Sequence, residues 1–84
     1  MEIVTVYSRS GCHLCENALN EIKKFSAEFK FQIEEILIDG DEELEKKYGE
    51  EIPVILINGK RHDFFKVDPE RFRSAMQNES RRHQ

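Results

Sequence analysis

The sequence predicts an α/β fold, a four-stranded mixed sheet with flanking helices in the order β-α-β-α-β-β-α. Short apolar runs read as strands, helical spacing recurs between them, and Asn58-Gly59 joins the last two runs as a two-residue hairpin. A strand, a helix and a second strand imply a right-handed crossover between parallel strands. The hairpin makes the last two strands antiparallel.

The first three elements are expected over residues 3–38, which include the most distinctive segment of the chain, residues 12–15. Residues 3–7 are β-branched and bounded by Ser8 to Gly11, as expected of a buried strand that ends in a turn. The next segment has helical spacing, which puts a mostly apolar stripe on one face. This stripe comprises Cys15, Ala18, Leu19, Ile22, Ser26 and Phe29, and it is widened by Phe25. Residues 31–38 then start as an alternating run and end apolar, as a strand that enters a core does.

A short helix is expected after Asp39-Gly40 has stopped the second strand. Asp41 is placed to cap this helix, with Leu44 and Tyr48 on its inner face. Gly49 is expected to supply a left-handed stop.

Two more strands follow. Residues 52–57 are apolar, and Pro53 must lie at the start of the strand because proline cannot donate to a central ladder. The return strand is expected over residues 60–67, where the alternation is weakest at Phe64 and Phe65. Its pairing register is the least determined feature of the sheet.

The last helix has a clear start. Asp68 provides a capping carboxylate, and Pro69 takes the first helical position. The buried edge of this helix comprises Phe72, Ala75 and Met76. The sequence is wholly polar from Asn78 onward, so we expect one domain over residues 1–77 and a frayed polar tail over residues 78–84.

Length and composition limit the possible classes. With 84 residues, 38% hydrophobic and 36% charged, the chain holds one small core and is not wholly disordered. No stretch approaches the roughly 20 apolar residues that cross a bilayer. Residues 1–6 lack the basic start of a secretory signal. We therefore expect a cytoplasmic protein without membrane association.

The charge argues against nucleic acid as a partner. The formal net charge is -4, so no general field attracts phosphate backbones. The distribution is uneven, because residues 34–51 are strongly acidic and basic residues predominate from Lys60 onward. These segments are either docking surfaces or, more simply, a solvated helix and a polar tail.

Both cysteines lie in one cluster, Cys12-His13-Leu14-Cys15. A bridge between them would close a tiny loop and constrain the unfolded chain only weakly, so fold stability is not its purpose. Half of a zinc site has the same spacing, but no second pair of cysteines exists and His62 and His83 lie far along the chain. A redox pair is therefore favoured. A dimer that shares two pairs, or a glutathione-assisted iron–sulfur cluster, remains open.

The predicted crossover delivers this cluster to the N-terminus of the first helix. There, unpaired backbone N–H groups and the positive end of the helix dipole favour the Cys12 thiolate, and Gly11 is expected to let the backbone approach closely. Cys15 lies almost one turn further on the apolar stripe, where burial keeps it a thiol. Cys12 is therefore assigned as the nucleophile and Cys15 as the resolving thiol. His13 is either a cation that assists Cys12 or an exposed first-turn residue.

Taken together and in order, these motifs resemble the glutaredoxin-like proteins of the thioredoxin superfamily. Residues 7–15 resemble a glutaredoxin strand, active-site loop and dithiol, Ile52-Pro53 resembles the family's cis-proline, and residues 58–60 resemble its hairpin. The run from Gly11 to Glu16 is most similar to an uncharacterised glutaredoxin-like group. The resemblance covers residues 3–76 and implies a thioredoxin-like fold.

The resemblance also implies an activity, that of a thiol-disulfide oxidoreductase without a tightly bound cofactor. It implies that the Ile52-Pro53 bond is cis and that the backbone beside it receives an extended thiol substrate. Arg9 takes the place of a basic residue that holds a glutathione carboxylate, and an exposed loop charge is the alternative interpretation. The expected substrate-binding residues are Arg9, Gly11, His13, Ile52 and Pro53.

Two departures from the glutaredoxin pattern leave the substrate open. His13 and Leu14 replace the usual proline and aromatic residue between the cysteines. Phe64 and Phe65 stand where a Gly-Gly pair helps to hold glutathione, and they are either a docking surface or, in part, core.

We expect a monomer that exchanges electrons with a protein disulfide or a low-molecular-weight disulfide. Glutathione or a reductase is the candidate electron donor. The alternative is a thioredoxin-like module without redox turnover, which binds a partner protein, an iron–sulfur cluster or zinc.

Overall fold

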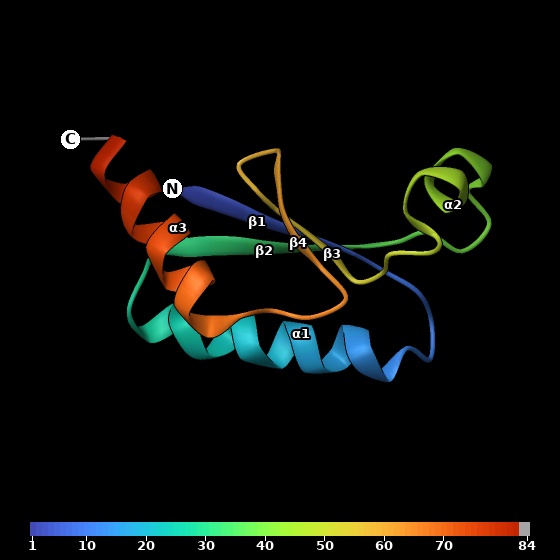
Figure 1. The fold of residues 1–84 in the computed structure, drawn as a ribbon, viewed down its shortest axis with the longest axis horizontal. Coiled ribbons are helices and arrows are strands. Elements are labelled where there is room, and N and C mark those ends of the chain that lie inside the picture. Colours follow the sequence, from blue (N-terminus) through green and yellow to red (C-terminus); the bar gives the residue numbers. More distant parts are fainter. Residues whose placement is uncertain (83–84) are drawn as a thin grey trace.

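The computed structural model describes residues 1–82, which form one sheet and three α-helices (Figure 1). The elements are β1 Glu2–Ser8, α1 His13–Lys24, a 3-10 turn Phe25–Ala27, β2 Phe31–Leu37, α2 Glu42–Tyr48, β3 Val54–Ile57, β4 Lys60–Phe64 and α3 Pro69–Arg82. The strand order is β2-β1-β3-β4. Strand β1 pairs in parallel with β2, whereas the pairs β1-β3 and β3-β4 are antiparallel. The predicted element order and mixed sheet are confirmed.

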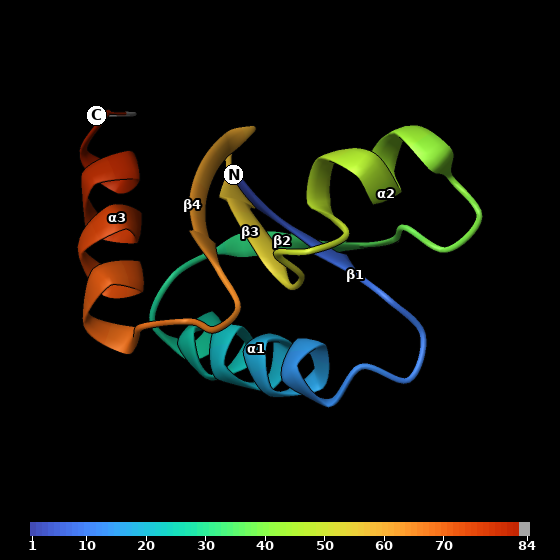
Figure 2. The same ribbon diagram turned by 45° about the vertical axis from the view of Figure 1, so that its right-hand side comes forward.

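The two faces of the sheet are covered differently. Helix α1 runs along one face, and α2 lies beyond the opposite face at one end of the strands (Figures 1 and 2). The core between α1, α3 and the sheet comprises Val4, Val6, Ala18, Ile22, Phe25, Ile55, Ile57, Val67, Phe72 and Met76. Across the sheet, the Tyr7 ring stacks on Tyr48 of α2 with the ring centroids 4.2 Å apart. The main core therefore lies on the α1 side.

Helix α1 is shorter than the sequence predicts. Its apolar face is buried as expected, but the α-helical backbone ends at Lys24 and tightens into the 3-10 turn. Ser26 is exposed, and its hydroxyl donates to the carbonyl oxygen of Lys23 at 2.7 Å. The stripe predicted through Phe29 therefore spans two elements, because the tighter winding changes the helical period.

Helix α2 begins as predicted but ends differently. The Asp41 carboxylate accepts the N–H groups of Glu43 and Leu44, each at 3.1 Å. The expectation of a left-handed Gly49 is wrong, since its φ is -54° and its ψ is -30°. A Cβ at Gly49 would lie 2.3 Å from the carbonyl oxygen of Glu45. Close approach, and not left-handed backbone, therefore explains this glycine.

The hairpin between β3 and β4 is confirmed. Asn58 and Gly59 have φ values of 51° and 82°, as a two-residue turn between twisted strands requires. The Asn58 side chain also accepts the N–H of Ile3 at 2.8 Å, which ties the hairpin to the start of β1.

Strand β4 is shorter than the predicted range 60–67. A bulge between Ile55 and Leu56 shifts the register, and this explains why the pairing could not be read from alternation alone. The strand ends at Phe64, and Phe65 has a left-handed φ of 68°. A residue in that region cannot continue a strand.

Helix α3 starts at the predicted cap. The Asp68 carboxylate accepts the N–H groups of Glu70 at 3.0 Å and Arg71 at 3.3 Å. Phe72 and Met76 are fully buried, as predicted for the inner edge of this helix. Neither α3 nor any other helix within residues 1–82 is long and apolar enough to cross a membrane.

The end of α3 differs from the frayed tail expected from Asn78. The helix continues to Arg82, and the Asn58 amide donates to the Glu79 carboxylate at 3.0 Å. Residues 83–84 of the expected polar tail lie outside the described residues.

Candidate active site

Cys12 lies at the N-terminus of α1, directly after the loop that follows β1. It is the N-cap residue with extended backbone, and its sulfur accepts the N–H of Cys15 at 3.2 Å. The Cys12 N–H donates to the carbonyl oxygen of Arg9 at 3.3 Å, which closes the loop. The Cys12 sulfur therefore lies at the positive end of the helix dipole, with one backbone N–H group directed at it.

Cys15 is the buried partner of Cys12. Its side chain is 2% exposed, whereas Cys12 is half-buried, and both thiols are free. Burial, followed by a hydrogen bond with the Cys12 side chain, raises the pKa of the Cys15 thiol to about 12. The pair therefore combines an accessible sulfur with a close, protonated one, as the sequence predicts.

Two polar residues of the sheet, Ser8 of β1 and Glu35 of β2, were not singled out from the sequence. The buried hydroxyl of Ser8 donates to the Glu35 carboxylate at 3.0 Å, and Glu35 pairs with Val6 across the β1-β2 ladder. The negative charge of Glu35 makes a smaller contribution to raising the pKa of Cys15. The sequence signal that could have identified Ser8 and Glu35 is their position near the carboxyl ends of two parallel strands.

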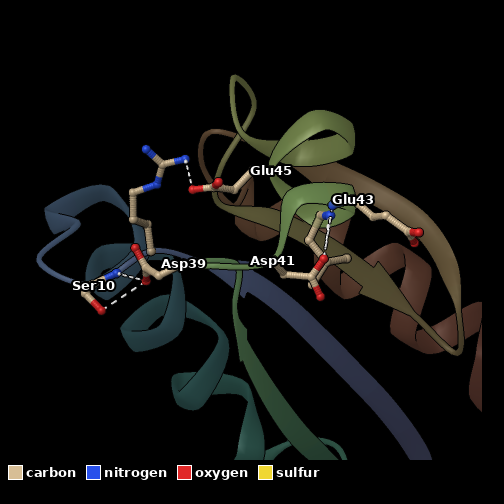
Figure 3. A network of polar contacts seen from close by, with 7 residues as sticks. Ser10, Asp39, Asp41, Glu43 and Glu45 are labelled. Carbon is tan, nitrogen blue, oxygen red and sulfur yellow. Dashed lines mark hydrogen bonds and ion pairs between the residues drawn. The ribbon is translucent and has the colours of Figure 1, made fainter.

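Asp39 anchors the active-site loop. Its carboxylate accepts both the N–H of Ser10 at 2.9 Å and the Ser10 hydroxyl at 3.0 Å, as Figure 3 shows. The donated N–H of Ser10 is the main cause that holds the pKa of Asp39 below its usual range. From the sequence Asp39 was interpreted only as the end of a strand. Because β1 and β2 are parallel, a polar residue directly after β2 reaches the loop that follows β1.

Gly11 is required by backbone conformation. Its φ is 72°, and a Cβ built there would have no atom outside its own neighbourhood within 4 Å. The expected close approach at Gly11 is therefore not made by another part of the folded chain, and for a substrate it stays a prediction. The left-handed turn before Cys12 is what favours glycine here.

Arg9 makes a contact with α2. Its guanidinium lies 3.8 Å from the Glu45 carboxylate, and both side chains are about two-fifths exposed. This pair contributes little to stability in water. A substrate carboxylate at Arg9 would compete with Glu45.

His13 is almost fully exposed in the first turn of α1. Its side chain is 94% accessible, and Nδ1 lies 3.8 Å from the Glu16 carboxylate. Within residues 1–82, no hydrogen bond between the side chains of His13 and Cys12 is present. This placement favours the interpretation of His13 as an exposed first-turn residue.

The Ile52-Pro53 peptide bond is cis, as the resemblance implies. Pro53 is buried, and its carbonyl oxygen accepts the N–H of Phe65 at 2.8 Å. Ile52 is half-buried at the start of the β3 segment.

Phe64 and Phe65 are both exposed, at 42% and 46%. The simpler expectation, that one of them belongs to the core, is therefore wrong. The left-handed backbone at Phe65 ends β4 before a second inward position is reached. A groove of about 120 Å³ lies between α1 and residues 65–67. It is lined on the helix side by Leu14, Asn17, Ala18 and Glu21.

The site contains no further metal-binding group in the part of the chain that the structure describes. Within residues 1–82, no three His, Cys, Asp or Glu side chains come together in a way that could hold a metal ion. The two cysteines would therefore need ligands from another molecule to complete a four-coordinate site.

We expect the two thiols to react differently with iodoacetamide. In the folded, reduced protein between pH 7 and 9, mass spectrometry should find alkylation at Cys12 only, because Cys15 is buried and protonated. In guanidinium chloride both cysteines should react. Modification of folded Cys15 at pH 8 at the rate of Cys12 would contradict this assignment.

The raised pKa also predicts how stability depends on pH. An unfolded cysteine ionises near pH 8.5, whereas folded Cys15 keeps its proton up to about pH 12. Between these values the unfolded state binds fewer protons, so the free energy of unfolding of the reduced protein should fall as the pH rises. Urea titrations at pH 8 and pH 10 measure this loss.

Comparisons with known proteins agree with this geometry. The model of the family described as Glutaredoxin-like domain (DUF836) matches residues 3–77. An uncharacterized protein of Mycobacterium tuberculosis (strain H37Rv) is 29% identical over an alignment of 76 residues, and the match covers 84% of this chain and 78% of that protein.

Solved structures show the same fold. Protein Ne2328 of Nitrosomonas europaea, solved by NMR, has a TM-score of 0.80 at 28% identity, covering 89% of this chain and 91% of that one. Thioredoxin of Fasciola hepatica has a TM-score of 0.62 at 21% identity, covering 92% of this chain and 79% of that one. The chain belongs to the glutaredoxin-like domain family and has the thioredoxin fold, with Cys12 and Cys15 close together at the start of α1.

Proposed function

We propose that this protein is a dithiol-disulfide oxidoreductase that reduces a substrate disulfide through a reversible Cys12–Cys15 bond. The observation that carries the proposal is the arrangement of the two sulfurs. Cys12 accepts the N–H of Cys15 at the helix start, and the buried Cys15 thiol lies within hydrogen-bonding reach of Cys12. A more accessible nucleophile beside a protonated second thiol suits two successive exchange steps.

In the first step, the Cys12 thiolate attacks one sulfur of the substrate disulfide. A Cys12–substrate bond forms, the substrate S–S bond breaks, and the departing thiolate takes a proton from water. Cys15 then loses its proton to water and attacks the sulfur of Cys12, which releases the second substrate thiol. The substrate gains two electrons and the protein becomes a disulfide. Glutathione or a reductase is the proposed donor that restores the dithiol.

A count of free thiols tests this proposal. After treatment with dithiothreitol the protein should show two reactive thiols in denaturant, and after equilibration with oxidised glutathione it should show none. Intermediate glutathione ratios should give one transition, from which the reduction potential follows. The Cys15→Ser variant is the matched control, because it cannot form the internal disulfide and should instead carry one bound glutathione.

Two results would contradict the proposal. The first is a wild-type protein that keeps both thiols in the oxidising buffer, as expected of a module that only binds a partner. The second is zinc or iron in stoichiometric amount after anaerobic purification, which would assign the cysteines to metal binding.

A further inference from the structure

A groove runs beside α1, the helix that carries the two cysteines at its start. It lies between α1 and residues 65–67, and its volume is about 120 Å³. Two of the residues that line it, Leu14 and Phe65, are large hydrophobic side chains with 53% and 46% of their surface exposed. The folded chain therefore leaves apolar surface uncovered at Leu14, two residues after Cys12.

One residue that lines the groove belongs to the dithiol segment. Leu14 lies in the first turn of α1, between Cys12 and Cys15 in the sequence. On the other side of the groove, the N–H of Phe65 donates to the carbonyl oxygen of Pro53 at 2.8 Å. A chain that is disulfide-bonded to Cys12 therefore brings its neighbouring residues to the groove.

The size and lining of the groove fit one apolar side chain. Sites for small molecules usually measure about 300–1,000 Å³, whereas an apolar cavity of about 150 Å³ holds one benzene molecule. Ala18 and Val67 add carbon surface, while Asn17, Glu21 and Lys66 are the polar residues of the lining, so that one cation faces the groove. Glu21 is already paired with Lys24 at 2.9 Å. Glutathione carries two carboxylates and no large apolar side chain. The groove therefore matches a residue of a polypeptide better than it matches glutathione.

The backbone at Phe65 gives independent support. Its φ of 68° is unfavourable for a bulky residue. Glycine or asparagine would adopt this value more easily. The conformation is maintained because the Phe65 N–H donates to the carbonyl oxygens of Pro53 at 2.8 Å and Glu51 at 3.4 Å. Strained residues held by their surroundings cluster at functional sites. Here the left-handed backbone presents the Phe65 ring to the groove.

From these observations we infer that the substrate is a protein disulfide with an apolar residue next to its half-cystine, and that this side chain occupies the groove between Leu14 and Phe65. The inference rests on the proposed function and names its substrate class. The exchange chemistry is unchanged, since the groove only adds binding to the disulfide that Cys12 attacks.

Two matched peptide disulfides test the inference. Each is the homodimer of a five-residue peptide with a central cysteine, which is flanked on both sides by leucine in one peptide and by asparagine in the other. We expect the reduced protein to reduce the leucine peptide about tenfold faster than the asparagine peptide and than oxidised glutathione. Rates that are equal for both peptides, or fastest with glutathione, would overturn the inference.

Two variants test whether the preference for the leucine peptide depends on the groove. Phe65→Asn keeps a residue that tolerates the left-handed backbone but removes the ring, so the ratio of the two rates should fall to about one. Leu37→Asn is the control, because Leu37 is 51% exposed on β2 and does not line the groove. It should keep the tenfold ratio. Loss of the ratio in Leu37→Asn, or its retention in Phe65→Asn, would count against the groove.

A binding experiment separates failure of the inference from failure of the proposed function. If the wild-type protein reduces no disulfide at all, the proposed function fails. The groove is then tested in a protein with both Cys12→Ser and Cys15→Ser, using cysteine-free serine versions of the two peptides. Amide NMR shifts at residues 65–67 with the leucine peptide only would support the groove. Absence of shifts, or self-association of the protein through this surface, would overturn it.

Discussion

Replacing Cys12 with serine should abolish disulfide reduction, lowering the rate by at least about 10³-fold, to that of the buffer. Serine is not an effective nucleophile toward a disulfide, and the remaining Cys15 is 2% exposed with a pKa of about 12. Reduction of bis(2-hydroxyethyl) disulfide, coupled to a thiol reductant, measures the effect.

Cys15→Ser is the matched comparison for this variant. It keeps the Cys12 sulfur and the helix start, so the first exchange should proceed and the protein should accumulate as a mixed disulfide. Mass spectrometry of the intact protein then shows the mass of one substrate thiol, which dithiothreitol removes. Normal turnover by Cys12→Ser would show that the nucleophile has been assigned wrongly.

Phe72→Ala should have the largest effect on stability, about 3–5 kcal/mol. The Phe72 side chain is fully buried, and its ring lies 5.0 Å from Phe25 and 6.1 Å from Phe31, measured between centroids. Removing it leaves a cavity where α1, α3 and the sheet meet. The free energy of unfolding of a small domain is about 5–15 kcal/mol, so the loss should be visible as a lower urea midpoint in circular dichroism.

Phe64→Ala is the control for the stability measurement. The same side chain is removed, but from a position that is 42% exposed, so the loss should stay below about 1 kcal/mol. Equal losses in the two variants would contradict the placement of the core on the α1 side of the sheet.

Features that depend on neighbouring residues in the chain were predictable from the sequence. Asn58-Gly59 specifies its own hairpin, Asp68 and Pro69 start α3, and Asp41 caps α2. The position of Cys12 at a helix start also follows from local order, because a β-α-β crossover brings that loop to the carboxyl edge of the sheet.

Features that depend on distant parts of the chain were not predictable in the same way. The tie between Ser10 and Asp39 joins residues that are separated by α1 and β2. The reason for Gly49 is its closeness to the Glu45 carbonyl, which only the packed last turn of α2 reveals. Likewise, the alternation is weakest at Phe64 and Phe65, but this does not indicate that Phe65 leaves the strand with a left-handed backbone.

For this protein, the sequence alone determined the order of elements and the location of the dithiol, since both depend on local periodicity, capping and spacing. The tertiary structure decided how the active-site loop is anchored and that Leu14 and Phe65 line one groove. The physical reason is that burial and contact between distant segments are set by how helices and sheet pack together. The amino-acid sequence carries that information only indirectly.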